Sequence, residues 1–254
     1  MLKIVIIGTG NISYHLCKAI IETKNLKLIE GFGRKKNPPK DLFNSISYCN
    51  NIKKIKKADL YILCVSDNAI SKISDELNIN KNSIVVHTSG STNMKLLSKH
   101  KNHGVIYPLQ TFSKSKKISF TNIPIIIEAN SKLILNKIRI ICSLISNKVI
   151  ECNNDQRTLI HISAVFANNF SNYMNLIAEE ILKSNNINSD ILYPLINETV
   201  NKLNYLSPKN AQTGPAIRND QITIQKHLNL LKGTKYFEIY DKLTKEIIKS
   251  KNEL

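Results

Sequence analysis

The chain has 254 residues, of which 42% are hydrophobic and 22% are charged. These proportions exclude an intrinsically disordered protein, and the length suffices for one large domain or for two of about 100 to 150 residues. Lysine and arginine outnumber aspartate and glutamate by 36 to 19, which gives a formal net charge of +17. The basic residues are spread along the chain and their short runs lack stacking aromatic residues, which favours a solvated lysine surface over nucleic-acid binding.

The five cysteines are scattered and form no C-x-x-C pair, which argues against a disulfide framework. We predict no metal site. No basic-then-apolar signal peptide opens the sequence, and no run of about 18 uncharged apolar residues follows. We therefore expect a cytoplasmic protein without a membrane segment.

The predicted elements begin with a strand, a glycine turn and a helix. The apolar run KIVII covers residues 3–7, GTGNIS follows at once, and a helical pattern comes next. A dinucleotide pyrophosphate requires this order, because Gly8 permits the tight turn, Gly10 lets the backbone approach the phosphates, and the helix N-terminus offers free N–H groups. Ser13 takes the third glycine position of the fingerprint and still allows close helix packing. The start of the chain therefore predicts a dinucleotide-binding domain.

The second predicted strand, LKLIEGFG at residues 26–33, ends beside Arg34, Lys35 and Lys36. In NAD enzymes a carboxylate near this strand end binds the ribose, whereas basic residues beyond it suit the additional phosphate of NADP. Glu30 is the candidate carboxylate, but Arg34 is better placed, so we expect NADP, with NAD as the alternative cofactor. A solvated basic loop is the competing interpretation of the three cations.

Further alternation of helices and strands predicts that the sheet continues. We expect helices over 51–58, 67–77 and 131–146, and strands over 59–65, 83–88, 104–112, 123–129 and 147–152. Because ligands bind at the carboxyl ends of parallel strands, the polar loops after two of these strands should face the cofactor. Those loops and strand ends contain Ser66, Asp67, His87, Ser89, Gly90 and Ser91.

From residue 153 the pattern becomes helical. Helices are expected over 153–183, 189–206 and 219–231, and a last one ends the chain. Asp155 is the predicted cap of the first. His161, Asn168 and Asn172 share one face of that helix. We interpret this stripe as a functional face rather than a solvated one, because Phe166 and two neighbouring alanines leave little exposed surface beside it.

The stretch QTGPAIRND, residues 212–220, joins two of these helices. Its Gly-Pro pair breaks any helix, and Asn219 or Asp220 is the predicted cap of the next one. The four arginines of this lysine-rich chain are Arg34, Arg139, Arg157 and Arg218. An arginine retained in such a sequence indicates a need for a planar, multi-donor group, so Thr213 and Arg218 are interpreted as part of an anion- or carbonyl-binding corner. The alternative is a purely structural turn and cap.

Several uncommon blocks occur together in one order along the chain. They are GTGNIS, HTSGS at 87–91, YPLQTFS at 107–113, IPIIIEA at 123–129, HISAVFANNFSNY at 161–173 and QTGPAIRND at 212–220. In this combination the chain resembles, nearly end to end, the Rossmann-like proteins with a DUF2520 C-terminal domain. These are relatives of pyrroline-5-carboxylate reductase and of the β-hydroxyacid dehydrogenases, and are described as NADP oxidoreductases.

The resemblance implies two domains and a homodimer. Residues 1–152 would form a Rossmann NAD(P)-binding domain of the α/β class. Residues 153–254 would form an all-helical domain like the C-terminal domain of 6-phosphogluconate dehydrogenase, which would supply the dimer contacts and one side of the substrate cleft. The β-hydroxyacid dehydrogenases carry a lysine and an asparagine on the first long helix between domains, where this chain has His161 and Asn168. No lysine occurs between Lys148 and Lys183.

These arguments give three sets of candidate residues. The catalytic candidates are His161 and Asn168. The cofactor-binding candidates are Gly8, Thr9, Gly10, Asn11, Ile12, Arg34, Lys35, Val65, Ser66, Asp67, Ser89 and Gly90. The substrate-binding candidates are Ser89, Ser91, Gln110, Thr111, Asn172, Thr213, Arg218 and Asp220.

The resulting hypothesis is an NADP-dependent oxidoreductase that transfers a hydride to a small carbonyl or imine. His161 would donate the proton, since histidine ordinarily titrates near neutrality. Asn168 would bind the substrate, and Arg218 would bind a substrate carboxylate. The alternatives are a nucleotide-binding sensor or assembly protein without catalysis and, less favoured, a nucleic-acid-binding protein.

Overall fold

The computed structural model describes residues 1–39 and 46–252, and the chain divides into two compact units, Met1–Asn169 and Phe170–Leu254. A domain boundary was expected after residue 152. Strand β8 (Val149–Glu151) does end there and helix α4 (Asn154–Ala164) follows, but the two compact units divide later, inside a continuous helical segment. We describe each unit by itself.

In the described part of the first unit, eight strands form one sheet. The other strands are β1 (Leu2–Ile7), β2 (Leu26–Phe32), β3 (Ser47–Cys49), β4 (Leu60–Leu63), β5 (Ile84–His87), β6 (Asn102–Pro108) and β7 (Ile125–Ala129). Their order is β3-β2-β1-β4-β5-β6-β7-β8, and all neighbours are parallel except the antiparallel pair of β6 and β7. The fold class expected from the sequence, a Rossmann domain followed by helices, is confirmed.

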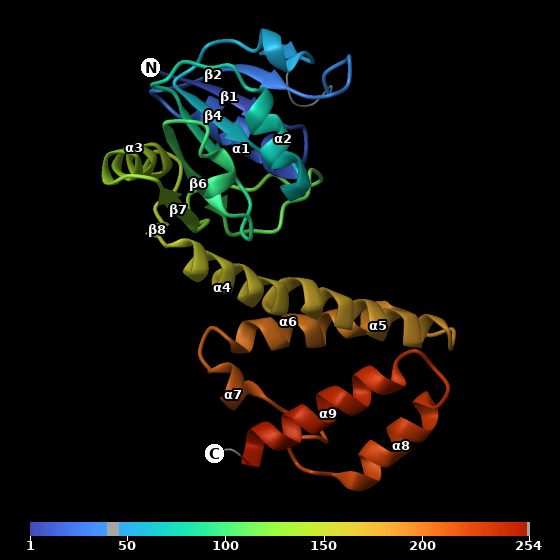
Figure 1. Cartoon of the computed structure of the whole chain (residues 1–254). Coiled ribbons are helices and arrows are strands. Elements are labelled where there is room, and N and C mark those ends of the chain that lie inside the picture. The colour runs from blue at the N-terminus through green and yellow to red at the C-terminus, as the bar shows by residue number, and fades with distance from the viewer. Residues whose placement is uncertain (40–45, 253–254) are drawn as a thin grey trace. The chain divides into compact units, whose positions relative to one another are not determined.

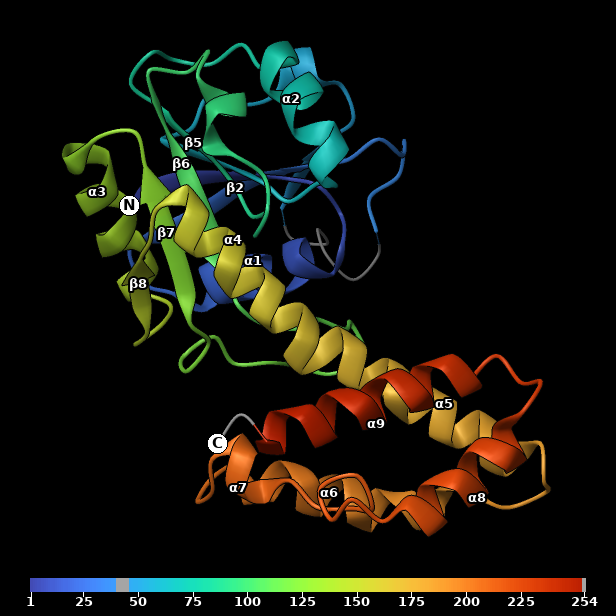
Figure 2. The ribbon, with the colours of Figure 1, turned by 60° about the horizontal axis from the view of Figure 1, so that its bottom comes forward.

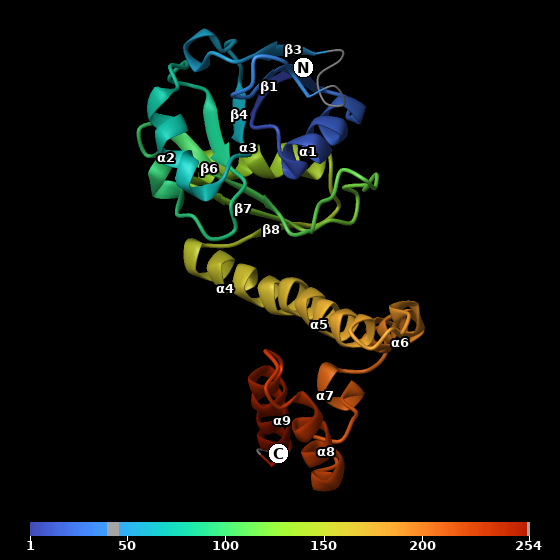
Figure 3. The same ribbon diagram turned by 90° about the vertical axis from the view of Figure 1, so that its right-hand side faces the viewer.

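Side chains that alternate along the strands divide the core between the two faces of the sheet. On one face, Ile4 and Ile6 of β1 pack in the cluster that includes residues of α1 (Asn11–Glu22) and α3 (Lys132–Ser143). On the other, Val5 and Ile7 pack in the cluster of α2 (Asp67–Glu76) and the 3-10 helix η2 (Met94–Leu97). Figure 3 shows α1 and α2 on opposite sides of the strands. Both faces are covered, as the continuous apolar strands require.

The prediction of a helix over 51–58 is wrong, because only the 3-10 turn η1 (Ile52–Lys54) forms there. The backbone N–H groups after it are used elsewhere. Lys56 N donates to Glu30 Oε2 over 2.7 Å, and Ala58 N donates to the Tyr61 hydroxyl over 2.9 Å. Two buried side chains, one on β2 and one on β4, therefore take the donors that a helix would have needed.

The cysteines are free thiols, and three of them, Cys17, Cys64 and Cys142, are buried. Burial raises the pKa of Cys64 and of Cys142 to about 12 and raises that of Cys17 as well. These thiols are core residues, held in the protonated and unreactive form.

Helix α4 begins with a capping box rather than with the expected cap. The Asn153 side chain accepts from Gln156 N over 2.9 Å, and Asn153 N donates to Gln156 Oε1 over 3.0 Å. Asp155 lies in the first turn of the helix instead. A second difference follows, since Val165–Phe170 form a π-helix, η3, before α5 (Ser171–Lys183). Figure 2 shows the start of α4 beside β7.

The described residues of the second unit form helices and the turns that connect them, and no strand. After α5 come η4 (Ser189–Leu192), α6 (Tyr193–Lys202), α7 (Pro208–Ala211), α8 (Gln221–Leu231) and α9 (Phe237–Asn252). Asp220 caps α8 by accepting from Thr223 N over 3.1 Å, as one of the two predicted caps. Helices α8 and α9 lie side by side (Figure 1). A hydrogen bond of 2.7 Å between His227 Nδ1 and the Tyr240 hydroxyl joins them.

Within the described residues, no helix is both long enough and apolar enough to span a membrane.

Candidate functional site

The turn after β1 leaves a helix N-terminus open. Gly8 has φ +124°, and a Cβ there would lie 2.1 Å from the backbone oxygen of Cys64, so only glycine fits. A Cβ on Gly10 would meet nothing within 4 Å. Gly10 is the N-cap of α1, which has no side-chain cap. The free N–H groups of α1 and the bare backbone above them form a cradle that fits an anion such as a pyrophosphate.

The loop after β2 presents cations. Arg34 and Lys35 are exposed, and the backbone oxygen of Lys35 accepts from the Tyr48 hydroxyl over 2.8 Å. Glu30, the alternative ribose-binding group, is only 3% exposed, and its oxygens accept from Ser47 Oγ and Lys56 N. The carboxylate is thus engaged inside the fold, which leaves the exposed cations Arg34 and Lys35 near the end of this strand.

The loop after β5 is tied to the start of α2. Ser89 Oγ accepts from the N–H groups of Ser91 and Thr92 and donates to Thr92 Oγ1. Ser91 Oγ in turn donates to Asp67 Oδ2 over 2.9 Å. The side chains of Ser89 and Ser91 therefore hold the loop in shape, and their polar atoms are committed to that task.

The side chain of Arg157 on α4 holds the same loop in place by hydrogen bonds. Its side chain is fully buried, and Nε and Nη2 both donate to Glu128 Oε2 of β7, over 3.2 and 3.1 Å. Nη1 donates to the backbone oxygens of Ser89 and Gly90, over 3.2 and 2.8 Å. Nη2 also donates to Asn154 Oδ1. This side chain uses the several donors of a planar guanidinium, which a lysine lacks.

The clamped loop lies against a tyrosine and histidine pair. The Tyr107 hydroxyl of β6 is 3.1 Å from His161 Nδ1 of α4. A Cβ on Gly90 would lie 2.6 Å from His161 Nδ1 and 2.8 Å from Tyr107 Cζ, so the loop backbone touches both rings. Burial raises the pKa of Tyr107, and the opposing effect of the nearby Arg157 is smaller. The tyrosine is thus a protonated hydroxyl at neutral pH, hydrogen-bonded to an imidazole.

These parts surround a cavity of about 620 Å³ at the carboxyl edge of the sheet. Among the predicted residues, its lining includes Asn11, Ile12, Val65, Asp67, Ser89, Gly90, Gln110, Thr111, His161 and Asn168. The predicted residues of the first unit outside its lining are Gly8, Thr9, Gly10, Arg34, Lys35, Ser66 and Ser91. Gly8, Thr9 and Gly10 lie on the glycine turn, and Arg34 and Lys35 lie on the loop after β2. Ser66 and Ser91 are close in sequence to the lining residues Asp67 and Ser89.

The remaining predicted residues belong to the second unit. Asn172 is exposed on α5, and Thr213 and Arg218 are exposed in the segment before α8. Asp220 caps α8, and its hydrogen bonds from the backbone and hydroxyl of Thr223 lower its pKa. The structural alternative for Asp220 is therefore realised.

Sequence reasoning missed Tyr107, Arg157 and the apolar wall of the cavity. That wall consists of Leu109, Phe112, Ala164, Val165 and Ala167. The sequence analysis also expected Phe166 to leave little exposed surface, whereas this residue is 64% exposed. A usable signal existed for Arg157, since scarce arginines were expected at multi-donor sites, but the sequence did not show which arginine had buried partners.

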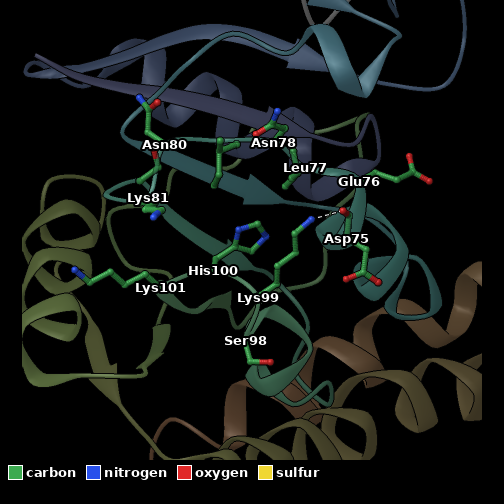
Figure 4. A pocket seen from close by; sticks show the side chains of 12 residues that line it. Asp75, Glu76, Leu77, Asn78, Asn80, Lys81, Ser98, Lys99, His100 and Lys101 are labelled. Carbon is green, nitrogen blue, oxygen red and sulfur yellow. Dashed lines mark hydrogen bonds between the residues drawn. The ribbon is translucent and has the colours of Figure 1, made fainter.

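A second hollow of about 490 Å³ lies at the other edge of the sheet, beside the end of α2 and the starts of β5 and β6. Figure 4 shows Lys99 reaching toward Asp75, whose backbone oxygen accepts its hydrogen bond. His100 Nε2 is 3.1 Å from Ser74 Oγ. These polar groups satisfy a helix C-terminus and one another, so this hollow offers no converging set for chemistry. Elsewhere in the described chain, no group of three or more His, Cys, Asp or Glu is placed to hold a metal ion.

Comparisons with known proteins agree with this layout. Residues 3–90 match the family described as NADP oxidoreductase coenzyme F420-dependent, and residues 123–247 match the domain of unknown function DUF2520. Protein BF3122 of Bacteroides fragilis, provisionally named an NADP oxidoreductase, is 34% identical, with 98% of each chain covered and a TM-score of 0.91. The chain belongs to this family of NADP oxidoreductases with a DUF2520 domain. None of the curated proteins matches it.

Two more distant structures share the fold of this oxidoreductase family. The pyrroline carboxylate reductase of Plasmodium falciparum, solved with NADP bound, is 11% identical over 97% of this chain and 98% of that one, with a TM-score of 0.61. The imine reductase of Myxococcus stipitatus, in complex with NADP+, is 15% identical over 99% of this chain and 93% of that one, with a TM-score of 0.65. At these identities the likeness shows the fold.

Proposed function

We propose that this protein is an NADP-dependent reductase of a small carbonyl or imine, with the substrate in the cavity of about 620 Å³. The observation that carries the proposal is that one cavity joins the first residues of α1, Asn11 and Ile12, to the hydrogen-bonded pair of Tyr107 and His161. The proposed cofactor site and the proposed proton donor would thus be neighbours. The names of the imine reductase and pyrroline carboxylate reductase that share the fold support the same substrate class.

The residues present fit a dinucleotide. The bare backbone at Gly10 and the uncapped N-terminus of α1 would receive the pyrophosphate, and Arg34 would pair with the 2′-phosphate. The backbone of Ser89 and Gly90, held by Arg157, would face the nicotinamide. When bound, NADPH would supply the hydride.

The chain's own residues would bind the substrate and move the proton. Tyr107 and His161 together would donate it to the carbonyl oxygen or imine nitrogen, and the raised pKa of Tyr107 keeps its hydroxyl protonated for that role. Asn168, in the cavity lining, would hydrogen-bond the substrate. The apolar wall around Leu109 and Phe112 would exclude water. The substrate-binding roles of Thr213 and Arg218 stay predictions, to be tested by alanine substitution.

The first experiment is a titration of cofactor-free protein with NADPH and NADH. We expect much tighter binding of NADPH, and we expect Arg34→Ala to weaken NADPH binding while it leaves NADH binding unchanged. Arg139→Ala is the matched control, since that arginine is only partly buried and pairs only with Glu151 within the described residues. Equal affinity for the two nucleotides would contradict the role of Arg34, and no binding of either would contradict the proposed function.

The second experiment screens imines and keto acids for turnover with NADPH. For any substrate found, Tyr107→Phe and His161→Ala should each reduce kcat by about 10²-fold or more, the size of general acid catalysis. NADPH binding should persist in both variants. Binding without turnover of any tested compound would favour the alternative, a nucleotide-binding sensor.

We further propose that the protein is a homodimer through its helical unit. Among the described residues of that unit, few are buried, and the exposed apolar ones include Ile222 at 86%, Leu230 at 73% and Tyr205 at 67%. A domain of this size needs to bury more apolar surface than this, and a second copy of the chain would cover it. The free thiols are consistent with the cytoplasmic location that the sequence predicts.

A further inference from the structure

The segment between β6 and β7 crosses the first turns of α1. We call residues 109–123 the strap. Asn11 Nδ2 donates to the backbone oxygen of Phe112 over 2.8 Å, and His15 Nε2 is 2.9 Å from the backbone oxygen of Ser113. His15 is only 1% exposed, so this contact is built into the core. Because a carbonyl oxygen only accepts, Nε2 of His15 carries the proton.

Ring contacts hold the strap in the same place. The Phe112 ring centroid is 5.1 Å from that of His15 and 5.7 Å from that of Phe120, against which it stacks. Further along α1, Lys117 of the strap pairs with Glu22 over 3.0 Å. Hydrogen bonds, the ring contact between Phe112 and His15 and an ion pair therefore fix the strap to α1 at several points.

This anchoring brings Lys114 to the glycine turn. Its Nζ donates to the backbone oxygen of Thr9, the residue between Gly8 and Gly10, over 3.4 Å. It also lies 5.9 Å from the centroid of the Tyr14 ring. No salt bridge to Lys114 is found in the described part of the chain, in contrast to Lys117. An ammonium without a carboxylate partner thus stands beside the open N-terminus of α1.

We propose that the strap is a second wall of the dinucleotide site and that Lys114 binds the pyrophosphate. This inference rests on the proposed cofactor. The N-terminus of a helix contributes only about half a positive charge, whereas a pyrophosphate bridge carries two negative ones. The flexible stem of lysine lets its ammonium move from the neutral oxygen of Thr9 to a phosphate oxygen. Leu109–Phe112 of the same strap line the substrate cavity, so the strap joins the two sites.

The role predicts which ligands should respond. The pyrophosphate is common to NADPH and NADH, whereas the 2′-phosphate belongs to NADPH alone. Lys114→Ala should therefore weaken both nucleotides by the same factor, about tenfold for one charged hydrogen bond. Arg34→Ala should weaken NADPH alone. The ratio of the two affinities thus separates the two cations.

The test is calorimetric titration of wild type, Lys114→Ala and Lys114→Glu with each nucleotide at one fixed ionic strength. Lys116→Ala and Lys116→Glu are the controls, since Lys116 is an exposed cation of the same strap and gives the same change in net charge. We expect Lys116 variants to stay within about twofold of wild type, because screened surface charges contribute little. Circular dichroism would verify that each variant is folded.

Each outcome is decisive. Parallel losses for both nucleotides, larger in Lys114→Glu than in Lys114→Ala, support the inference. Unchanged affinities in both Lys114 variants overturn it and leave the proposed function intact. A loss confined to NADPH overturns it by assigning the lysine to the 2′-phosphate. Failure of the wild-type protein to bind either nucleotide overturns the proposed function and this inference with it.

Discussion

At the scale of single residues, Arg157 connects the parts of the candidate site. It joins β7, α4 and the loop after β5 through Glu128, Asn154 and two backbone oxygens. The Arg157 and Glu128 side chains are 0% and 10% exposed, whereas those of the surface pair Arg139 and Glu151 are 40% and 54% exposed. Two arginine–glutamate pairs in one chain therefore differ mainly in burial.

This difference predicts unequal losses of stability. Arg157→Met should lower the free energy of unfolding by about 3 to 5 kcal/mol, because it leaves a buried carboxylate and two backbone oxygens without their partner. Arg139→Met should cost less than about 1 kcal/mol. Urea unfolding followed by circular dichroism measures both, and similar losses in the two variants would contradict the clamp.

His87 predicts a loss of stability in acid. Burial, with a smaller effect from Arg157, lowers its pKa from the usual 6.5 to about 4. Its Nδ1 accepts from Ser89 N, and its buried Nε2 has no hydrogen-bond partner among the described residues. Between pH 6.5 and 4, His87 binds a proton in the unfolded chain but not in the folded chain. The stability that depends on neutral His87 is therefore complete above pH 6.5 and falls as the pH drops toward 4.

The size of the effect is up to roughly 3 kcal/mol. His87→Asn keeps an acceptor for Ser89 N but cannot titrate. Its free energy of unfolding should therefore change less than that of wild type between pH 7 and pH 4.5, as measured by urea midpoints at both pH values. An identical pH dependence in wild type and variant would show that His87 does not take part.

At the scale of elements, the two glycines of the turn from β1 to α1 are expected to serve different purposes, one in stability and the other in cofactor binding. Its two glycines differ in surroundings, since a Cβ on Gly8 would strike the backbone of Cys64 and a Cβ on Gly10 would enter open space. Gly8→Ala should cost more than about 3 kcal/mol of stability through steric overlap and a strained backbone.

Gly10→Ala should leave stability within about 1 kcal/mol of wild type, the usual cost at an N-cap. It should weaken NADPH binding about tenfold or more, because the methyl group occupies the space through which the phosphates approach. Thermal unfolding and NADPH titration of the two variants check both statements. Unchanged affinity in Gly10→Ala would remove the glycine turn from the cofactor site.

The elements also show what sequence can predict. The order of strand, turn and helix was predictable, because local apolar patterns and glycines encode it. The helix expected over 51–58 was not formed, because Glu30 and Tyr61 bind its N–H groups from other strands. The cap at Asn153 and the π-helix after α4 depend on competition between neighbouring side chains and on packing, which periodicity does not record.

The candidate site divides in the same way. The glycine turn and the polar loops at strand ends were predicted from short motifs. Tyr107 and His161 are 54 residues apart, and Arg157 contacts a loop 67 and 68 residues away, so neither contact leaves a local signal. Arginine scarcity pointed to the correct kind of residue, and only the three-dimensional arrangement selects Arg157 among the four.

At the scale of the whole molecule, the exposed apolar side chains of the helical unit predict self-association. The chain has a mass of 28.8 kDa, and light scattering after gel filtration should give about twice that mass for a dimer. Leu195→Lys, at a side chain 63% exposed in that unit, should shift the mass toward the monomer. Leu133→Lys, 66% exposed on α3 of the other unit, is the control and should not. A monomeric wild type would contradict the dimer.

The buried thiols described in the first unit also provide a way to follow unfolding. The chain contains no tryptophan, so the usual fluorescence signal is missing. Thiol reagents attack thiolates, and in the folded protein Cys17, Cys64 and Cys142 are buried and protonated while Cys49 and Cys152 are partly exposed. The two populations should therefore react in separate phases, and the slow phase would time the opening of the sheet core without any added residue.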